Sequence, residues 1–238
     1  MPGTLSQPTL SGPLEENGWW LWRASAPGVE VRFLGRGGDT KGSRDAVLAA
    51  VAPLAPSVAW AKQVHSATVL TARLGACGEG DALVTDRAGL ALSVATADCV
   101  PVLLAGPQGL AAVHAGWRGL VGGVLAATFA TLGGRDWTAW IGPAIGPCCY
   151  EVDEPVVGPL RAAFPEAWEG WVHPGAPGRP GHWSLDLWAA NADQLAAAGI
   201  PAGAISNPRL CTGCRRDLFF SYRREGMAGR LATLAVLD

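Results

Sequence analysis

Charge is scarce in this chain, and lysine is scarcer still. Of 238 residues only 16% are charged, the formal net charge is −2, and just two of the 18 basic residues are lysines, Lys41 and Lys62. Proteins that bind nucleic acid or anionic membranes attract them with clustered positive charge. Because the sequence offers no such basic field, we expect no nucleic-acid or membrane partner, and we expect the ligand to be a small molecule.

Long apolar runs are also missing. No uninterrupted stretch reaches the length of about 20 residues that a membrane-spanning helix needs. The N-terminal residues show no basic start followed by an apolar core, as a secretory signal would. We therefore expect a cytoplasmic protein, in which the six cysteines are free thiols or metal ligands rather than disulfides.

Histidine is rare as well, and the positions of two of the four histidines suggest a metal site. Of the four histidines, His65 in AWAKQVHS and His114 in AAVHAGWRG lie where an apolar run meets turn or glycine-rich sequence. Cys99 in ATADCVP has the same setting. Two imidazoles and a thiolate supply three of the four ligands that zinc binds and leave one position for water or substrate. The compact zinc patterns HExxH and paired CxxC are absent.

The segment from Cys99 to His114 predicts an antiparallel hairpin. Two apolar runs, VPVLL and LAAVH, flank the turn-forming tetrapeptide GPQG. With the turn centred between Pro107 and Gln108, Cys99 and His114 lie at the same hairpin end, within about one residue pair of direct opposition. The sequence spacing does not show that His65 lies near this end of the hairpin. Spacing alone favours the alternative of a hydrogen-bonded strand-end histidine and a small buried cysteine.

Arg118 follows His114 within AGWRGLVGG, at a predicted junction between strand and helix. Free backbone N–H groups and the helix dipole favour an anion at such a junction. The arginine could then bind phosphate through two hydrogen bonds. The alternative is an arginine paired with a surface carboxylate.

The remaining patterns predict an α+β fold with mixed β-sheets flanked by helices. Residues 1–18 are rich in proline, glycine and polar side chains and predict a loosely ordered lead-in to a single domain, 19–238. Strands and helices do not alternate strictly, which argues against a doubly wound sheet. Strand-like runs are expected in 19–38, through the middle third and at the C-terminal end, and helices within 39–54, 120–132, 152–164 and 184–199.

Six separated motifs together resemble one known family. They are KQVHSATV, GDALVTD, ATADCVPVLL, AAVHAGWRG, IGPAIGPCCYEV, and CTG followed by FFSYRREG, in the same order. They resemble the YfiH-like family, first described as multicopper polyphenol oxidases or laccases and since assigned as zinc-dependent purine nucleoside phosphorylases. The resemblance runs from roughly residue 30 to the last residue.

This resemblance implies a fold, a metal and an activity. The fold would be related to cysteine-hydrolase-like toxins, and residues 19–238 would form one YfiH-like catalytic domain. His65, Cys99 and His114 would be the zinc ligands and catalytic residues. The reaction would be cleavage of adenosine, inosine and guanosine by phosphate to base and ribose 1-phosphate, with adenosine deamination and methylthioadenosine cleavage as further activities.

The resemblance also suggests residues that contact substrate. A family stretch that places a hydroxyl residue before arginine reads FLGRGGDTKG here, which keeps Arg36 but not the hydroxyl residue. Arg36 and Arg118 would neutralise the anion. Gln63 and Arg223 are further substrate-contact candidates, and Trp117 could stack on a purine. By motif position, Asp81, Asp98 and Gln63 are candidates for the general acid or base. Tyr222, like Arg223, could line the substrate pocket or support the fold.

Other chemistries compete for the same atoms. A multicopper oxidase needs many more histidines for its copper centres than the four present, so copper binding would be adventitious. A cysteine hydrolase, such as an enzyme that edits peptidoglycan precursors, would use Cys99 as nucleophile, His114 as base and Asp98 or His65 to orient it. A metal-binding module without catalysis is a third option.

A second group of cysteines comprises Cys148, Cys149, Cys211 and Cys214. A single CxxC with an adjacent CC pair lacks the two-knuckle spacing of structural zinc sites. Spacing therefore argues against a second metal here. The sequence gives no indication of the oligomeric state.

Overall fold

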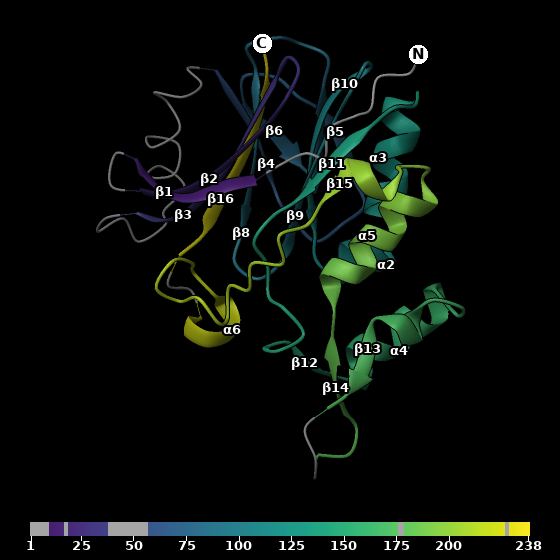
Figure 1. Ribbon diagram of the computed structural model, residues 1–238. Helices are drawn as coiled ribbons and strands as arrows, with labels where there is room; N and C mark the ends of the chain where they lie inside the picture. Colours follow the sequence, from purple (N-terminus) through teal and green to yellow (C-terminus); the bar gives the residue numbers. More distant parts are fainter. Residues whose placement is uncertain (1–9, 17–18, 38–56, 176–178, 227–228) are drawn as a thin grey trace.

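Two large β-sheets lie face to face, and helices cover the outer side of one of them (Figure 1). The computed structural model describes residues 10–16, 19–37, 57–175, 179–226 and 229–238. The seven-stranded sheet has the order β1-β2-β3-β16-β8-β4-β6 and the six-stranded sheet the order β15-β11-β9-β10-β7-β5. This mixture of parallel and antiparallel pairs confirms the predicted α+β class.

The strands of the seven-stranded sheet come from the first 96 residues of the chain and from its C-terminal end. They are β1 (Leu10–Glu16), β2 (Trp19–Ala26), β3 (Val29–Gly37), β4 (Val58–Lys62), β6 (Gly75–Glu79), β8 (Ala91–Thr96) and β16 (Leu231–Leu237). The expected strand pair in 19–38 is confirmed as β2 and β3, and the closing C-terminal strand as β16.

The six-stranded sheet contains the hairpin that the sequence predicts. Its strands are β5 (Val69–Thr71), β7 (Ala82–Thr85), β9 (Val100–Gly106), β10 (Gly109–Ala115), β11 (Thr138–Ile141) and β15 (Ile205–Ser206). In the β9–β10 pair, Gly106 faces Gly109 and Val100 faces Ala115. The turn is therefore centred between Pro107 and Gln108, and no bulge is needed to bring Cys99 and His114 to one end.

The β9–β10 hairpin separates two hydrophobic cores. Alternate residues point to opposite faces of a strand, so Leu103 and Leu110 pack between the two sheets, against β3, β8 and β16. Val102 and Val113 point the other way, toward the helices. Since both faces are buried, the hairpin is apolar throughout rather than alternating.

The helices pack on the outer face of the six-stranded sheet, and a small third sheet extends from it (Figure 1). These helices are α2 (Trp117–Val121), α3 (Val124–Leu132), α4 (Glu154–Ala163) and α5 (Leu187–Ala197), with short 3-10 helices η1 (Trp168–Gly170) and η2 (Ala202–Ala204). The short helix α6 (Tyr222–Glu225) lies apart from them (Figure 1). The third sheet has the order β12-β14-β13, formed by β12 (Glu151–Asp153), β13 (Val172–Pro174) and β14 (His182–Leu185).

Two expectations differ from the structure. The single helix expected over 120–132 is wrong, because Gly123 adopts a left-handed backbone (φ 80°) that ends α2 and starts α3. Within the lead-in expected at 1–18, residues 10–16 form β1 on the edge of the large sheet. A Cβ at Gly12 would lie 2.7 Å from the Trp22 ring, so the glycine allows this pairing. The helix expected within 39–54 lies outside the described residues.

Gly109 provides a test of how the hairpin is held. Its backbone has φ 131°, and a Cβ there would lie 2.3 Å from the Thr85 carbonyl oxygen on β7. We expect Gly109→Ala to lower the free energy of unfolding by about 2 to 4 kcal/mol, because backbone strain and a backbone clash combine. Gly89→Ala, at φ 72° with nothing within 4 Å, should cost about 1 kcal/mol. Urea denaturation measures both, and equal losses would contradict this account of the turn.

Candidate metal centre

The Asp81 carboxylate organises one end of the hairpin. It lies directly before β7 and is 1% exposed. It accepts hydrogen bonds from the backbone N–H groups of Val64 (3.2 Å), His65 (3.0 Å) and Ser66 (2.6 Å). The Ser66 hydroxyl donates a further bond at 2.8 Å. One buried carboxylate thus holds the loop that follows β4.

The same carboxylate orients His114. Asp81 Oδ1 lies 2.8 Å from His114 Nδ1, and the His114 backbone N–H donates to the Asp81 carbonyl oxygen at 2.7 Å. The register of β10 with β7, in which Val113 faces Ala82, brings these two residues together. Because Nδ1 is engaged, His114 presents Nε2 to the site.

His65 completes the group that the sequence proposed. The Asp81 contacts hold its backbone at φ 61°, and its Nε2 lies 3.9 Å from Cys99 Sγ. The two imidazole rings meet edge to face with centroids 4.9 Å apart. The possible ligand atoms of His65, Cys99 and His114 all lie within 4.8 Å of one another.

Gly116 lets the cysteine approach the hairpin end. A Cβ at Gly116 would lie 2.8 Å from Cys99 Sγ and 3.6 Å from the His65 ring. The small residue that follows β10 is therefore required by packing around the sulfur. The glycine-rich sequence after His114, which predicted an anion site, thus also makes room for the Cys99 sulfur.

The three groups shift one another's proton affinity. Burial would raise the pKa of Cys99, but hydrogen bonds with His114 and His65 and their positive charge lower it to about 6. Burial would lower the pKa of His114, but its bonds with Asp81 and Cys99 raise it to about 9. Burial also opposes ionisation of Asp81, yet its bonds to His114 and Ser66 hold its pKa well below the usual range.

This arrangement can hold a metal ion and leave one side open. His114 is buried, Cys99 is half-buried and His65 is exposed. A histidine whose other ring nitrogen is bonded to a carboxylate is typical of metal sites. Three protein ligands with one solvent-facing side are typical of a catalytic rather than a structural metal site.

A pocket of about 260 Å³ opens beside the three groups. Arg118 and Arg223 both line it, and Arg118 lies over the Trp117 ring at 4.2 Å from its centroid. The full lining is His65, Ala97, Asp98, Cys99, Trp117, Arg118, Ile145, Tyr150, Leu187, Tyr222 and Arg223. Two cationic groups and three aromatic side chains therefore border one hollow.

Asp98 lines the pocket, but its carboxylate is already engaged. It accepts from the Thr212 hydroxyl at 2.6 Å and from the Arg223 backbone N–H at 2.7 Å. Its own backbone is at φ 88°. Asp98 therefore ties the segment before Cys99 to the loop that carries Thr212 and to helix α6, which carries Arg223.

Gln63 and Arg36 are held elsewhere. The Gln63 amide donates to the Ala95 carbonyl (2.7 Å) and accepts from the Ala95 N–H (2.9 Å), so it continues the pairing of β4 with β8. Arg36 donates to the Phe219 carbonyl, pairs with Glu225 and lies over the Phe220 ring. Neither belongs to the described residues that line the pocket, and both brace segments beside it.

Several residues at the site escaped the sequence analysis. Thr212 and Ser66 act through hydrogen bonds to Asp98 and Asp81, and Tyr150 forms part of the pocket wall. Ser66 adjoins His65 in the KQVHSATV motif, which was the available signal. Thr212 and Tyr150 lie in the CTG and CCYEV motifs, where the sequence analysis considered only the cysteines.

The other two histidines do not belong to this ligand group. His173 is on β13 and His182 on β14, in the small third sheet. The site therefore contains two of the four histidines. This placement offers no set of histidine ligands for several copper ions.

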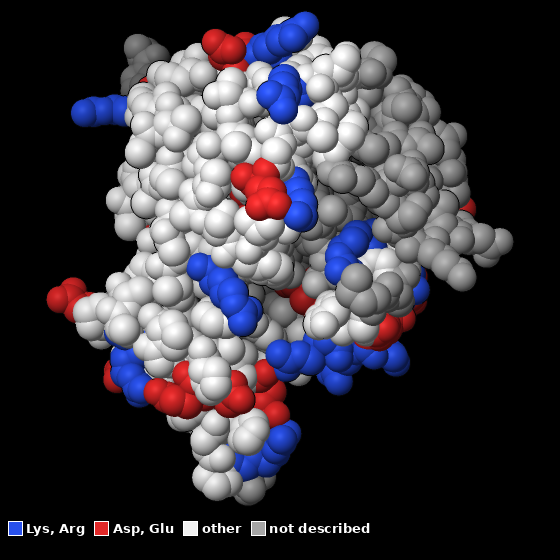
Figure 2. All heavy atoms as spheres, turned by 180° about the vertical axis from the view of Figure 1, so that it is seen from behind, with Lys and Arg blue, Asp and Glu red and all other residues white. Residues whose placement is uncertain are grey.

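Charge is spread thinly over the surface. On the face in Figure 2, basic and acidic side chains lie interspersed on a mostly uncharged surface. None of the helices in the described residues combines the length and apolar character needed to cross a lipid bilayer.

Comparisons with known proteins agree on one family. The family model described as multi-copper polyphenol oxidoreductase laccase matches residues 39–238. A relative from Xylella fastidiosa (strain 9a5c), named purine nucleoside phosphorylase, is 43% identical over 194 residues, covering 76% of this chain and 72% of the relative. Purine nucleoside phosphorylase YfiH of Escherichia coli K12 is 35% identical over 180 residues, covering 73% and 71%.

Solved structures show the same likeness. YlmD from Geobacillus stearothermophilus has a TM-score of 0.81 at 33% identity, with 94% of this chain and 98% of that chain covered. The hypothetical protein YfiH from Bacillus licheniformis has a TM-score of 0.82 at 28% identity, with 94% and 100% covered.

Asp81 provides a test of the metal centre. We expect Asp81→Asn to weaken zinc binding about 10- to 100-fold, because an amide cannot accept the same set of bonds or support His114 as a ligand. Competition with a chromophoric chelator measures the affinity. Asp217→Asn, which removes an exposed pair with Arg215, is the matched control. Equal affinities in the two variants would contradict the role given to Asp81.

Cys99 provides a second test, in the metal-free protein. Because its pKa is lowered from 9.0 to about 6, its alkylation by iodoacetamide should stay fast at neutral pH. The rate should fall to half only near pH 6, as the thiolate becomes protonated. Peptide mass spectrometry after timed alkylation measures the rate, with glutathione as the reference thiol. A midpoint as high as that of glutathione would refute the stabilised thiolate.

Proposed function

This chain belongs to the YfiH-like family, described as multi-copper polyphenol oxidoreductase laccase, and we propose that it is a zinc-dependent purine nucleoside phosphorylase. The observation that carries the proposal is the group of His65, Cys99 and His114 beside a pocket lined by arginine and aromatic side chains. Relatives named purine nucleoside phosphorylase support it. The partners of the protein are then small molecules, a purine nucleoside and phosphate.

The proposed reaction exchanges one bond for another at the sugar. An oxygen of phosphate forms a bond to C1′ of the ribose, and the bond between C1′ and the purine nitrogen breaks. The electron pair of that bond leaves with the purine, which takes up a proton. The products are the free base and ribose 1-phosphate. Adenosine, inosine and guanosine are the proposed substrates, with methylthioadenosine as a further one.

Zinc fits the donor set. Two imidazole nitrogens and a thiolate are ligands that zinc favours, and the lowered pKa of Cys99 makes the thiolate available near neutral pH. His114 would bind through Nε2, because Nδ1 is bonded to Asp81. When bound, zinc supplies a Lewis acid that polarises an oxygen in the open position. Copper would bind the same atoms only adventitiously.

The two pocket arginines suit an anionic co-substrate. Within the described part of the chain, Arg118 forms no ion pair with a carboxylate, and its guanidinium lies over the Trp117 ring in the pocket wall. Arg223 donates to the Glu151 carbonyl and lies over the Tyr150 ring, which fixes its position. A fixed positive charge binds phosphate and stabilises negative charge that develops during reaction.

Aromatic side chains suit a purine. Trp117 and Tyr222 border the pocket, and Tyr222 is exposed, so its ring is free to cover a ligand. Burial raises the pKa of Tyr150 to about 12, which keeps its hydroxyl protonated and able to donate a hydrogen bond. Adenosine deamination would use water instead of phosphate in the same pocket.

A cysteine hydrolase is the second candidate, and one observation favours it. Cys99, His114 and Asp81 form a series of thiol, imidazole and carboxylate in which the pKa of the thiol is lowered. The same order activates the nucleophile of cysteine hydrolases. In that case Asp81, rather than Asp98 or His65, orients the imidazole. A peptidoglycan precursor is the substrate class to test.

Phosphate dependence tests the main proposal. We expect the zinc-loaded protein to release the purine from adenosine, inosine or guanosine only when phosphate is present, with ribose 1-phosphate in equal amount. Liquid chromatography of the base and a coupled assay of the sugar phosphate measure the products. Conversion of adenosine to inosine without phosphate would report the deaminase activity.

Cys99→Ala supplies the control for the site. We expect this variant to lose the zinc of this centre and all phosphate-dependent turnover. Cys77→Ala changes a buried cysteine outside both cysteine-containing clusters and should keep both. No turnover of any nucleoside by the wild-type protein, or full activity in Cys99→Ala, would sink the proposal.

A further inference from the structure

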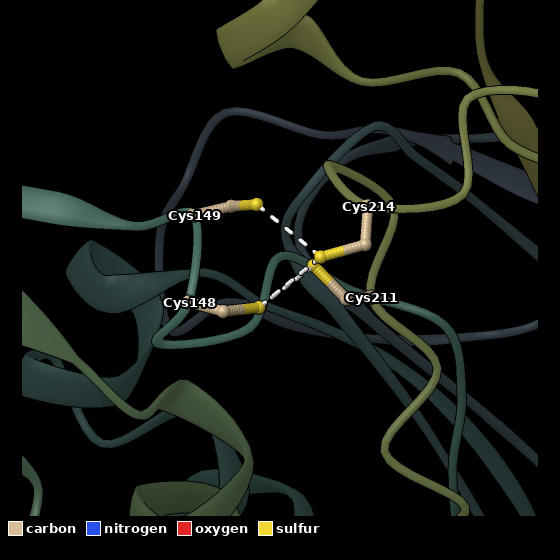
Figure 3. Close-up of side chains that lie close together, drawn as sticks. All are labelled: Cys148, Cys149, Cys211 and Cys214. Carbon is tan, nitrogen blue, oxygen red and sulfur yellow. Dashed lines mark hydrogen bonds between the residues drawn. The ribbon is translucent and has the colours of Figure 1, made fainter.

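Four of the six cysteines meet at one place outside the centre described above (Figure 3). Cys148 and Cys149 lie in the loop between β11 and β12, and Cys211 and Cys214 lie in the loop between β15 and α6. Their sulfurs all lie within 4.8 Å of one another. The close-up shows the two pairs facing each other across the gap between their loops.

We propose that these four cysteines bind a second zinc ion, whose role is structural. A tetrahedral site with Zn–S distances of about 2.3 Å places its sulfurs about 3.8 Å apart. Here Cys148 Sγ lies 3.4 Å from Cys214 Sγ and 3.5 Å from Cys211 Sγ, and Cys149 Sγ lies 3.5 Å from Cys214 Sγ. A disulfide needs about 2.05 Å, and all four are free thiols.

Backbone bonds hold the two loops in register. Ala144 and Cys211 form a parallel bridge, with Ala144 N–H donating to the Leu210 carbonyl (3.1 Å) and Thr212 N–H to the Ala144 carbonyl (3.0 Å). These contacts position both cysteine pairs independently of any ion. The adjacent CC pair, which lacks the usual knuckle spacing, is therefore brought to the CxxC by tertiary structure.

The surroundings of the sulfurs suit thiolates. The Gly146 N–H donates to Cys211 Sγ at 3.3 Å, and an Arg224 guanidinium nitrogen donates to Cys149 Sγ at 3.2 Å. On binding, each thiol transfers its proton to solvent, and four thiolates with one zinc ion leave a net negative charge. The arginine and the backbone donor offset part of that charge.

Glycine in the CTGC turn makes room for the opposite loop. A Cβ at Gly213 would lie 2.7 Å from Cys149 Cβ and 3.0 Å from Cys149 Sγ. A side chain there would push the two cysteine pairs apart. The glycine between Cys211 and Cys214 thus allows the two cysteine pairs to lie close together.

A site with four thiolate ligands has no open position, so its role is to fix structure. The same two loops, with helix α6 that follows the second of them, carry part of the pocket wall. Tyr150 follows Cys149, Arg223 precedes Arg224, and Thr212, between two of the cysteines, donates to Asp98 beside Cys99. The second ion would therefore fasten these wall residues to one another.

Metal stoichiometry tests the proposal without reference to nucleoside cleavage. We expect the full chain, loaded with zinc under reducing conditions and desalted, to retain two zinc ions by elemental analysis. The double variant Cys148→Ser, Cys214→Ser should retain one, and so should Cys99→Ala. Cys77→Ser is the matched control and should retain two. One zinc in the wild type, unaffected by the double variant, would overturn the second site.

Cobalt gives a readout that does not depend on the folding of the double variant. Cys99→Ala loaded with Co²⁺ should show the sulfur-to-cobalt charge-transfer and visible bands of a tetrahedral tetrathiolate site. Absence of these bands would overturn the proposal. So would an intact mass that shows disulfides among the four cysteines in protein purified under reducing conditions.

Discussion

The site depends on the buried carboxylate of Asp81. Asp81 lies directly before β7, and its carboxylate bonds both to the loop after β4 and to His114 at the end of β10, so that three separate segments meet there. Unpaired, a charge at this depth would cost several kcal/mol, so the donors around it are part of the fold's stability as well as of the site. The arrangement of His65 and the orientation of His114 both follow from satisfying this one group.

The β9–β10 hairpin beside that carboxylate could be predicted from the sequence, but the approach of His65 to its end could not. The hairpin follows from GPQG between two apolar runs, and its register confirms that Cys99 and His114 share one end. The approach of His65 depends on where β4 and β7 sit in two different sheets, which no local pattern encodes. Only the resemblance in motifs supplied it. The break at Gly123 shows the opposite error, since apolar content predicted one helix and a single backbone angle divided it.

That a residue belongs to a family motif also does not show whether its side chain lines the pocket or bonds to a neighbouring segment. Arg36 and Gln63 belong to segments that resemble family motifs, yet Arg36 bonds to the Phe219 carbonyl and Glu225, and Gln63 bonds to the Ala95 backbone. Arg118 and Arg223 line the pocket because α2 and α6, the helices that carry them, both lie beside Cys99. The four cysteines Cys148, Cys149, Cys211 and Cys214 were grouped from the sequence, but their spacing argued against a second metal, for a related reason. Sequence spacing tests whether ligands share a local loop, whereas here two loops are brought together by the bridge between Ala144 and Cys211.

The choice between a metal ligand and a nucleophile for Cys99 comes down to charge. Without metal, the lowered pKa of Cys99 and the raised pKa of His114 describe a thiolate beside an imidazolium, with Asp81 as a second negative group. That set carries an excess of negative charge in a partly buried position. A divalent cation that displaces the proton from His114 Nε2 balances this negative charge. His65, which a cysteine nucleophile does not require, then serves as the third ligand. The position of His65 within 4.8 Å of the other two ligand atoms therefore favours the metal over the nucleophile.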